Sequence, residues 1–233
     1  MLIGCDPELI VIKNNSFVEA CQFFQSDGGW GCDGNSAIAE VRPGCDESPL
    51  ILTAKIRHLM ARVRKDLPDL DYLAGAYKHG HAIGGHIHIS DKTFLPTRRL
   101  VENLDRYLTD CLSDLIDPVA ERAKRRDRYG KKGEWEGKSS CHIEYRTPVS
   151  WLVNPWVTLA NLCVAKAVAF LTLSGKKADN KDFPFYAEDK LKMLLALLNK
   201  GIPDDCKAGI KLIPKILENP PGWRMPISEQ WEV

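Results

Sequence analysis

The chain has 233 residues, which is enough for one large domain or two small ones. Hydrophobic residues make up 44% and charged residues 27%, as is ordinary for a folded soluble protein. Lysine and arginine number 32 against 31 aspartate and glutamate residues, which excludes a global field that steers the protein toward nucleic acid or a membrane.

Eight cysteines raise the question of disulfides or zinc. No two of them are spaced as C-x-x-C, and the chain is too long for a mini-domain stapled by disulfides. Residues 1–6 run straight into a polar pair and show no signal-peptide pattern. We therefore expect reduced, mostly buried thiols in a cytoplasmic protein.

Short strands and turns are predicted over the first 45 residues. Residues 4–12 predict a strand that turns at Asn14-Asn15, with residues 17–25 as a candidate for the returning strand. Residues 26–35 hold four glycines and two aspartates and predict a loop. Residues 37–42 predict the next strand.

Helices dominate the rest of the chain. Apolar residues near helical spacing predict a helix over 48–67 and a long amphipathic helix over 97–127, bent or interrupted at Pro118. The other expected elements are strands at 84–90 and 142–148, helices at 155–174, 187–199 and 207–218, and an irregular tail from residue 219.

The most apolar run, Pro155–Leu173, carries Asn161 and Lys166 and begins with an Asn-Pro start signal. A core helix explains it better than a membrane span. The simplest account is one α+β catalytic domain over residues 1–233, with a sheet-rich active-site part (1–150) and a helical part (151–233). We expect an antiparallel sheet whose other face is covered by helices.

Four of the predicted strands each place two polar groups two residues apart. In a strand, residues i and i+2 point to the same face, so each pair lies on one side of a sheet. If the strands share a sheet, one face collects four carboxylates, two imidazoles and two guanidiniums, which is costly to cover unless metal or phosphate neutralises it. This pattern indicates an enzyme. The pairs are Asp6 with Glu8, Glu40 with Arg42, His86 with His88, and Glu144 with Arg146.

Each pair also has a plainer interpretation. Asp6 and Glu8 could hold divalent ions such as Mg²⁺ or Mn²⁺, but taken alone such a pair is better explained by an exposed strand face with a turn-forming Asp-Pro. Glu40 and Arg42 fit a surface ion pair. Glu144 adds a metal-ligand candidate beside a forked guanidinium, and a buried structural ion pair is the alternative.

The segment Gly84-Gly85-His86-Ile87-His88 is more specific. Two histidines on one face of an apolar strand favour metal or phosphate contact over a purely structural role. Related His-x-His pairs occur in zinc enzymes, so the motif leaves the metal open.

A basic, glycine-punctuated stretch over 125–138 is typical of either a solvated helix end or a mobile loop that closes over polyphosphate. It matches no Walker A pattern, and no G-x-G-x-x-G follows a strand, so the nucleotide sites of those two folds are disfavoured.

Taken together, these motifs resemble those of the glutamine-synthetase-like carboxylate–amine ligases, most closely the phage-type COOH–NH2 ligase group, also called amidoligase type 2. The likeness spans about residues 4–150 in the family's order. It is carried by Gly4-Cys5-Asp6-Pro7-Glu8, Ala39-Glu40-Val41-Arg42-Pro43-Gly44, Gly84-Gly85-His86-Ile87-His88 and Glu144-Tyr145-Arg146-Thr147-Pro148.

The resemblance implies a curved antiparallel sheet whose concave face binds ATP and two or three Mg²⁺ or Mn²⁺ ions. By matching position, Glu8 and Glu40 would hold one ion, and a second, bridging the β- and γ-phosphates, would be held by Asp6, His86 and Glu144. Asp6 departs from the family pattern, because glutamine synthetases carry glutamate there.

The resemblance also implies phosphate contacts. His88 would lie near the phosphates, and Arg146 would contact the transferring phosphoryl group or the substrate carboxylate. Arg42, Arg128 and Lys132 are further candidates for cofactor contact, the last two matched by segment rather than by motif.

We therefore predict an ATP-dependent ligase that forms an amide or peptide-like bond through an acyl phosphate. Its partners would be small-molecule or peptide carboxylates and amines, with no nucleic acid or membrane, in a host cytoplasm if the gene is a phage gene. The alternatives are a zinc metallohydrolase built on His86, His88 and a carboxylate, and a binding protein that kept the fold without catalysis.

Overall fold

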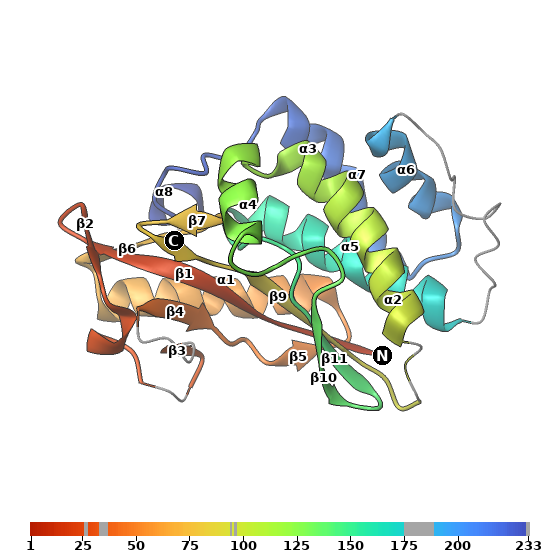
Figure 1. The fold of residues 1–233 in the computed structure, drawn as a ribbon, viewed down its shortest axis with the longest axis horizontal. Coiled ribbons are helices and arrows are strands. Elements are labelled where there is room, and N and C mark those ends of the chain that lie inside the picture. Colours follow the sequence, from red (N-terminus) through yellow and green to blue (C-terminus); the bar gives the residue numbers. More distant parts are fainter. Residues whose placement is uncertain (26–27, 33–36, 94, 96, 175–188, 232–233) are drawn as a thin grey trace.

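The computed structural model combines helices with an antiparallel sheet (Figure 1). It describes residues 1–25, 28–32, 37–93, 95, 97–174 and 189–231. The main path of the nine-stranded sheet runs β10-β11-β9-β1-β4-β3, and β2, β5 and β6 also pair with β1. The strands of this sheet are β1 (Leu2–Lys13), β2 (Ser16–Val18), β3 (Trp30–Cys32), β4 (Ile38–Val41), β5 (Cys45–Asp46), β6 (Leu70–Leu73), β9 (Gly85–Ser90), β10 (Trp135–Ser139) and β11 (His142–Tyr145). A separate hairpin joins β7 (Tyr77–Lys78) to β8 (His81–Ala82).

The long central strand β1 has two faces of opposite character. Leu9 and Val11 are fully buried in the main hydrophobic core, whereas Asp6 and Glu8 alternate with them and point to the other face. At its end, Asn14 (φ 50°) and Asn15 (φ 61°) adopt the left-handed conformation that a tight hairpin requires. The predicted turn is confirmed.

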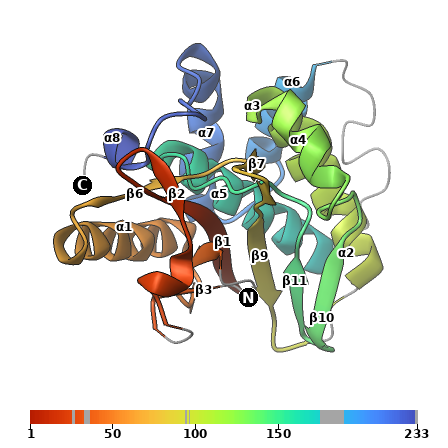
Figure 2. The same cartoon turned by 60° about the vertical axis from the view of Figure 1, so that its left-hand side comes forward.

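Helices cover the apolar face of the sheet. Helices α1 and α5 contribute to the core that β1 and β9 line, and α7 and α2 pack against α5. Figures 1 and 2 show α5 and α7 as one layer, with the hairpin of β10 and β11 projecting at the edge of the molecule. The helices are α1 (Pro49–Asp66), α2 (Thr97–Leu104), a π-helical segment (Asp105–Ser113), α3 (Asp114–Ile116), α4 (Val119–Arg126), α5 (Pro155–Leu173), α6 (Lys190–Ala196), α7 (Asp204–Glu218) and α8 (Ser228–Trp231).

Helix α5 is the apolar run of the sequence. Its length and hydropathy alone would suit a membrane span, but 83% of its most apolar stretch is buried inside the protein. The Asn154 side chain caps its start by accepting a hydrogen bond from the Val157 N–H at 2.9 Å. The predicted core helix is confirmed.

Several sequence predictions need correction. The helix expected over 97–127 is interrupted at Pro118, as predicted, but before that it widens into a π-helical segment that was not expected. The loop expected over 26–35 contains strand β3, and its residues 26–27 and 33–35 lie outside the described residues. The strand expected to return over 17–25 pairs with β1 only as far as Val18.

The eight thiols are all free, as expected. Four of them are buried, and Cys21 and Cys45 are exposed, so the expectation of mostly buried thiols holds for only half of the set.

Candidate active site

The register of the sheet aligns the polar pairs. Glu8 lies opposite Glu40, Asp6 lies opposite His86, and His88 lies opposite Glu144. Residues directly opposed in an antiparallel ladder point to the same face, so the pairs meet on the side of the sheet away from α1 and α5. The predicted gathering on one face is confirmed. We call Asp6, Glu8, Glu40, His86, His88 and Glu144 the acidic cluster.

Short distances join the members of the acidic cluster. Nδ1 of His86 lies 3.2 Å from Oε1 of Glu144 and 3.8 Å from Oδ1 of Asp6. Nε2 of His88 lies 2.8 Å from Oδ2 of Asp6. Nε2 of His86 lies 4.0 Å from Oε1 of Glu8, which is only 2% exposed. One potential ligand atom each from Asp6, His88 and Glu144 lies within 4.8 Å of the others.

Burial and neighbouring charges set the protonation of the cluster. Burial lowers the pKa of His86 to about 4, so its ring is neutral at pH 7 and suited to coordinate a metal. Burial acts to raise the pKa of Asp6, but its hydrogen bond to His88 and the nearby imidazoles outweigh burial and lower it. For His88, burial acts to lower the pKa, but the hydrogen bond and charge of Asp6 prevail and raise it.

Two buried polar atoms of the cluster lack hydrogen-bond partners among the described residues. They are Oδ1 of Asp6 and Nε2 of His86. Buried polar atoms are normally satisfied, and four carboxylates gathered in one place repel each other. A divalent cation would give the two atoms a partner and neutralise the carboxylates, because carboxylate and imidazole are its usual ligands. The residues therefore fit a metal ion.

The glycine pair before His86 is required by close packing. A Cβ atom on Gly84 would stand 2.5 Å from Nε2 of His86 and 2.8 Å from Nη2 of Arg125. The N–H of Gly84 donates to Oε2 of Glu8, so the backbone itself approaches the cluster. The glycines thus bring β9 close to both β1 and Arg125.

Each predicted arginine of a polar pair contacts the glutamate of its own pair. Nε of Arg42 donates to Oε2 of Glu40 at 2.5 Å, and Nη2 donates to the Cys32 carbonyl at 3.0 Å. Nε of Arg146 lies 3.5 Å from Oε1 of Glu144. Both guanidiniums therefore border the acidic cluster.

A cavity of about 410 Å³ opens beside the cluster. Three charged side chains line it, one carboxylate from the cluster and two guanidiniums, Arg128 and Arg146, which suits a ligand with anionic groups. The described residues that line it are Glu8, Ile38, Gly80, His81, Ala82, Arg128, Tyr129 and Arg146.

The basic stretch over 125–138 contains the end of α4 and a segment without helix or strand over 127–134, and it is anchored at Arg125. Arg125 is 1% exposed and donates to the carbonyls of Thr147 at 2.7 Å and Arg146 at 2.9 Å. Strand β10 takes up the end of the stretch. Nζ of Lys132 lies 2.5 Å from Oδ2 of Asp110 on the π-helical segment, and within the described chain no contact joins Lys132 to the acidic cluster.

Sequence reasoning missed several neighbours of the cluster. Nζ of Lys138 lies 2.6 Å from Oε2 of Glu144, and Nε2 of His142 lies 3.0 Å from Nδ1 of His88. His142 stands two residues before Glu144 in a predicted strand, so the same-face rule could have found it. The hydroxyl of Tyr129 donates to Oε2 of Glu8, and no pattern in the local sequence predicts that contact.

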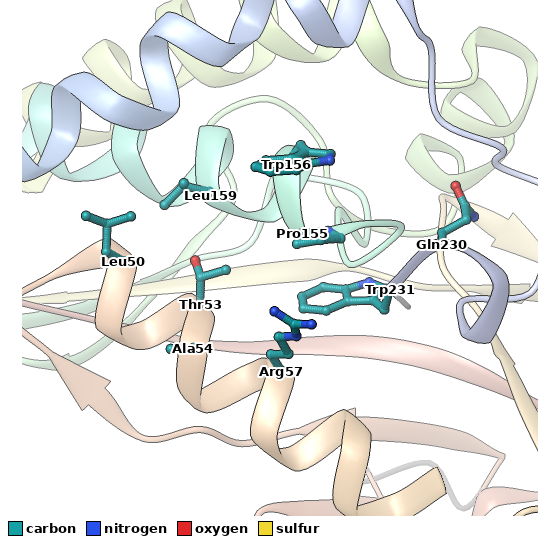
Figure 3. Close-up of a pocket in the computed structure, with 9 residues that line it drawn as sticks. All are labelled: Leu50, Thr53, Ala54, Arg57, Pro155, Trp156, Leu159, Gln230 and Trp231. Atoms are coloured by element: carbon teal, nitrogen blue, oxygen red, sulfur yellow. The ribbon is translucent and has the colours of Figure 1, made fainter. Parts of the chain in front are cut away.

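Another hollow, of about 330 Å³, lies among α1, α5 and α8. Figure 3 shows Trp156 and Trp231 across from Leu50 and Thr53 there, with Arg57 as the charged group. Among the described residues that line it there is no carboxylate or imidazole, so it does not resemble the acidic cluster.

The family model for phage phiEco32-like COOH-NH2 ligase type 2 matches residues 3–202. No curated protein matches the chain. Among solved structures, apo GmaS without ligand is similar at 14% identity and a TM-score of 0.53, covering 94% of this chain and 68% of GmaS. The complex of the prokaryotic ubiquitin-like protein Pup and its ligase PafA gives 9% identity and a TM-score of 0.49, covering 93% of this chain and 63% of that one.

The likeness to GmaS agrees with the sheet and its helical layer, which form a glutamine-synthetase-like α+β fold. Because the family model spans most of the sequence, the chain belongs to the phage phiEco32-like COOH-NH2 ligase type 2 family of carboxylate–amine ligases.

Proposed function

We propose that the protein is an ATP-dependent ligase that joins a carboxylate to an amine through an acyl phosphate. The observation that carries the proposal is the buried acidic cluster, with unsatisfied atoms on Asp6 and His86, beside a cavity flanked by two arginines. Such a site is suited to bind divalent ions together with phosphate and carboxylate groups.

The proposed metal ligands follow the register of the sheet. Glu8 and Glu40, opposed on neighbouring strands, would hold one ion. Asp6, His86 and Glu144 would hold another, with His88 next to them through its hydrogen bond to Asp6. Mg²⁺ or Mn²⁺ bound there would neutralise the anionic oxygens of ATP and of the acid.

The proposed anion contacts come from the arginines. Arg146 borders both Glu144 and the cavity, which supports the proposal that it contacts the transferring phosphoryl group or the substrate carboxylate. Arg128, on the cavity wall, would contact phosphate. Arg42 would contact the cofactor next to Glu40, with which it forms a hydrogen bond. We leave Lys132 out of the proposed site, because its ammonium pairs with Asp110.

The proposed reaction has two steps. A carboxylate oxygen of the acid attacks the γ-phosphorus of ATP, and ADP leaves with the electrons of the broken phosphorus–oxygen bond. The amine nitrogen then attacks the acyl carbon, phosphate leaves, and the proton of the amine passes to solvent or phosphate. Arg146 would stabilise negative charge in the first step and orient the acid, since a guanidinium binds two oxygens at once.

Isothermal titration with a non-hydrolysable ATP analogue tests the proposal. We expect binding in the presence of Mg²⁺ and loss of binding after EDTA is added. Screening of acid–amine pairs for ADP release would then follow. An absence of nucleotide binding in both conditions would contradict the proposal and favour a non-catalytic binding protein.

A zinc-dependent hydrolase is the second candidate, because ligand atoms of Asp6, His88 and Glu144 lie within 4.8 Å of each other. A carboxylate and histidine set of this kind suits zinc. The two arginines that line the cavity, Arg128 and Arg146, favour the ligase, since a hydrolase has less need of phosphate-binding groups. Hydrolysis that requires Zn²⁺ and proceeds without ATP would select the hydrolase.

A further inference from the structure

Oε2 of Glu8 is engaged by two donors from different parts of the chain. It accepts hydrogen bonds from the backbone N–H of Gly84 and from the hydroxyl of Tyr129. Glu8 is 2% exposed, so water cannot readily replace either donor. Two donors occupy the lone pairs of one carboxylate oxygen, and Oε1 is then the oxygen that faces His86, 4.0 Å away.

Tyr129 is itself held in place. Its ring lies under the guanidinium of Arg125, with 4.4 Å between the Arg125 Cζ atom and the ring centroid, and the edge of His86 meets it at 6.1 Å between centroids. Its N–H donates to the Arg125 carbonyl at 3.0 Å. Because Arg125 is tied to the carbonyls of Thr147 and Arg146, the hydroxyl of Tyr129 has little freedom to leave Glu8.

The Tyr129 hydroxyl is the donor in this contact, because a carboxylate oxygen can only accept.

The number of oxygens that Glu8 can offer bears on the choice of cation. Ca²⁺ takes six to eight oxygen ligands and frequently binds both oxygens of one carboxylate. Mg²⁺ is smaller, requires near-octahedral geometry and uses single carboxylate oxygens together with water. A carboxylate with one oxygen withheld is thus a poorer ligand for Ca²⁺ than for Mg²⁺.

We propose that Tyr129 is a positioning residue that sets cation selectivity: by holding Oε2 of Glu8, it makes Glu8 a ligand through one oxygen and disfavours Ca²⁺ relative to Mg²⁺. This inference rests on the proposed function, since it takes Glu8 to be a metal ligand. It goes further by assigning a role to a residue that need not touch the metal or substrate.

The test compares cation binding by the full chain without nucleotide. Free Mn²⁺ is followed by electron paramagnetic resonance, and Mg²⁺ or Ca²⁺ is then added to displace the bound Mn²⁺. The variant is Tyr129→Phe, which removes one oxygen atom. The matched control is Tyr72→Phe, because Tyr72 is a buried tyrosine of β6 whose hydroxyl has no hydrogen-bond partner among the described residues.

Tyr129→Phe should weaken Mn²⁺ and Mg²⁺ binding about tenfold, the lower end of what loss of an outer-shell partner usually does. Ca²⁺ binding should be unchanged or stronger, so the ratio of the Ca²⁺ to the Mg²⁺ dissociation constant should fall about tenfold relative to wild type. Tyr72→Phe should leave this ratio as in wild type. Partial unfolding would weaken both ions by the same factor, so the ratio isolates the role of the hydroxyl.

The outcomes separate the two proposals. An unchanged ratio in Tyr129→Phe, with wild type binding Mn²⁺, would overturn the role of Tyr129 and leave the proposed function standing. Failure of wild type to bind any of the three ions would overturn the metal site, and the role of Tyr129 with it.

Discussion

Glu144 contacts two cationic groups and the neutral ring of His86. Its Oε1 lies 3.2 Å from Nδ1 of His86 and 3.5 Å from Nε of Arg146, and its Oε2 lies 2.6 Å from Nζ of Lys138. Replacing this carboxylate is costly, because the buried His86 loses a partner and so do the half-buried Lys138 and Arg146. We therefore expect Glu144 to be the most sensitive position of the cluster.

Glu144→Gln should lower ADP release at least about 100-fold, since even loss of outer-shell partners of a metal typically costs about 10–100-fold. The substitution keeps the size of the side chain but removes the charge that would bind a cation. Steady-state ADP release at saturating Mg²⁺ measures the effect. Glu218→Gln, at an exposed position of α7, is the matched control. Retained turnover in Glu144→Gln would remove Glu144 from the proposed ligands.

Asp117, between α3 and α4, predicts a pH effect on stability that does not involve the cluster. Burial raises its pKa from the ordinary 3.8 to about 6, although Ser113 and nearby arginines act to lower it. The folded protein therefore holds a proton that the unfolded chain releases between about pH 4 and 6. Stability attributable to Asp117 falls as the pH rises through this window and stays constant above it.

Asp117→Asn should remove this fall, which amounts to at most about 3 kcal/mol for a shift of roughly two pKa units. Urea unfolding at pH 4, 5, 6 and 7 measures it, as the difference in unfolding free energy between variant and wild type. That difference should grow in favour of the variant up to pH 6 and then level off. The exposed Asp69→Asn serves as control. A difference that does not vary with pH would show that Asp117 is ionised in both states.

At the level of elements, the start of β9 is fixed by glycine. A methyl group at Gly84 would meet Nε2 of His86 at 2.5 Å and Nη2 of Arg125 at 2.8 Å, and neither group can move far, because both residues are buried. Gly84→Ala should therefore destabilise the protein by about 1–3 kcal/mol and weaken Mn²⁺ binding. Thermal unfolding and Mn²⁺ titration measure the two effects.

Gly137→Ala in β10 is the matched control for that variant. A methyl group there would meet only the ring of Trp135, at 3.2 Å, and this ring is exposed and free to shift. Equal destabilisation by both substitutions would mean that the close approach of β9 to His86 and Arg125 is not what requires Gly84.

The elements that sequence reasoning predicted well are those with a strong local pattern. Alternation gave β1, β9 and β11, and helical spacing gave α1, because a single buried face imposes one period on the sequence. Helix α5 was given by its apolar run and its Asn-Pro start. The pattern was misleading between residues 97 and 127, where apolar spacing continues through a π-helical segment that no local signal marks. Strand β10 was missed because all five of its residues are exposed, so no alternation arises.

The acidic cluster could be predicted for the same reason. The same-face rule places Asp6 with Glu8 and His86 with His88 from their spacing in the sequence alone. Tyr129 and Arg125 could not be found in this way, because their contacts with Glu8 and Gly84 join parts of the chain that only the folded topology brings together. The ion pair of Lys132 with Asp110 could not be found either, because charge alone does not reveal the partner.

For the whole molecule, the cluster ties together strands that are distant along the chain. Its ligand candidates come from β1, β4, β9 and β11, and the pairing of these strands forms the centre of the sheet. In the absence of cations, the four carboxylates repel one another across those strands. A bound ion would convert this repulsion into attraction, so metal binding and the stability of the sheet should be coupled.

Mn²⁺ should therefore raise the melting temperature of the whole protein, and EDTA should reverse the change. At a concentration 100 times the dissociation constant, an ion that binds only the folded state stabilises it by about 2.7 kcal/mol. For a chain of this size, that corresponds to an increase of about 5–10 °C, measured by circular dichroism. Glu144→Gln should lose most of the increase, whereas Glu218→Gln should keep it. An equal increase in both variants would place Mn²⁺ elsewhere on the protein, since only Glu144 belongs to the cluster that couples β11 to β9 and β1.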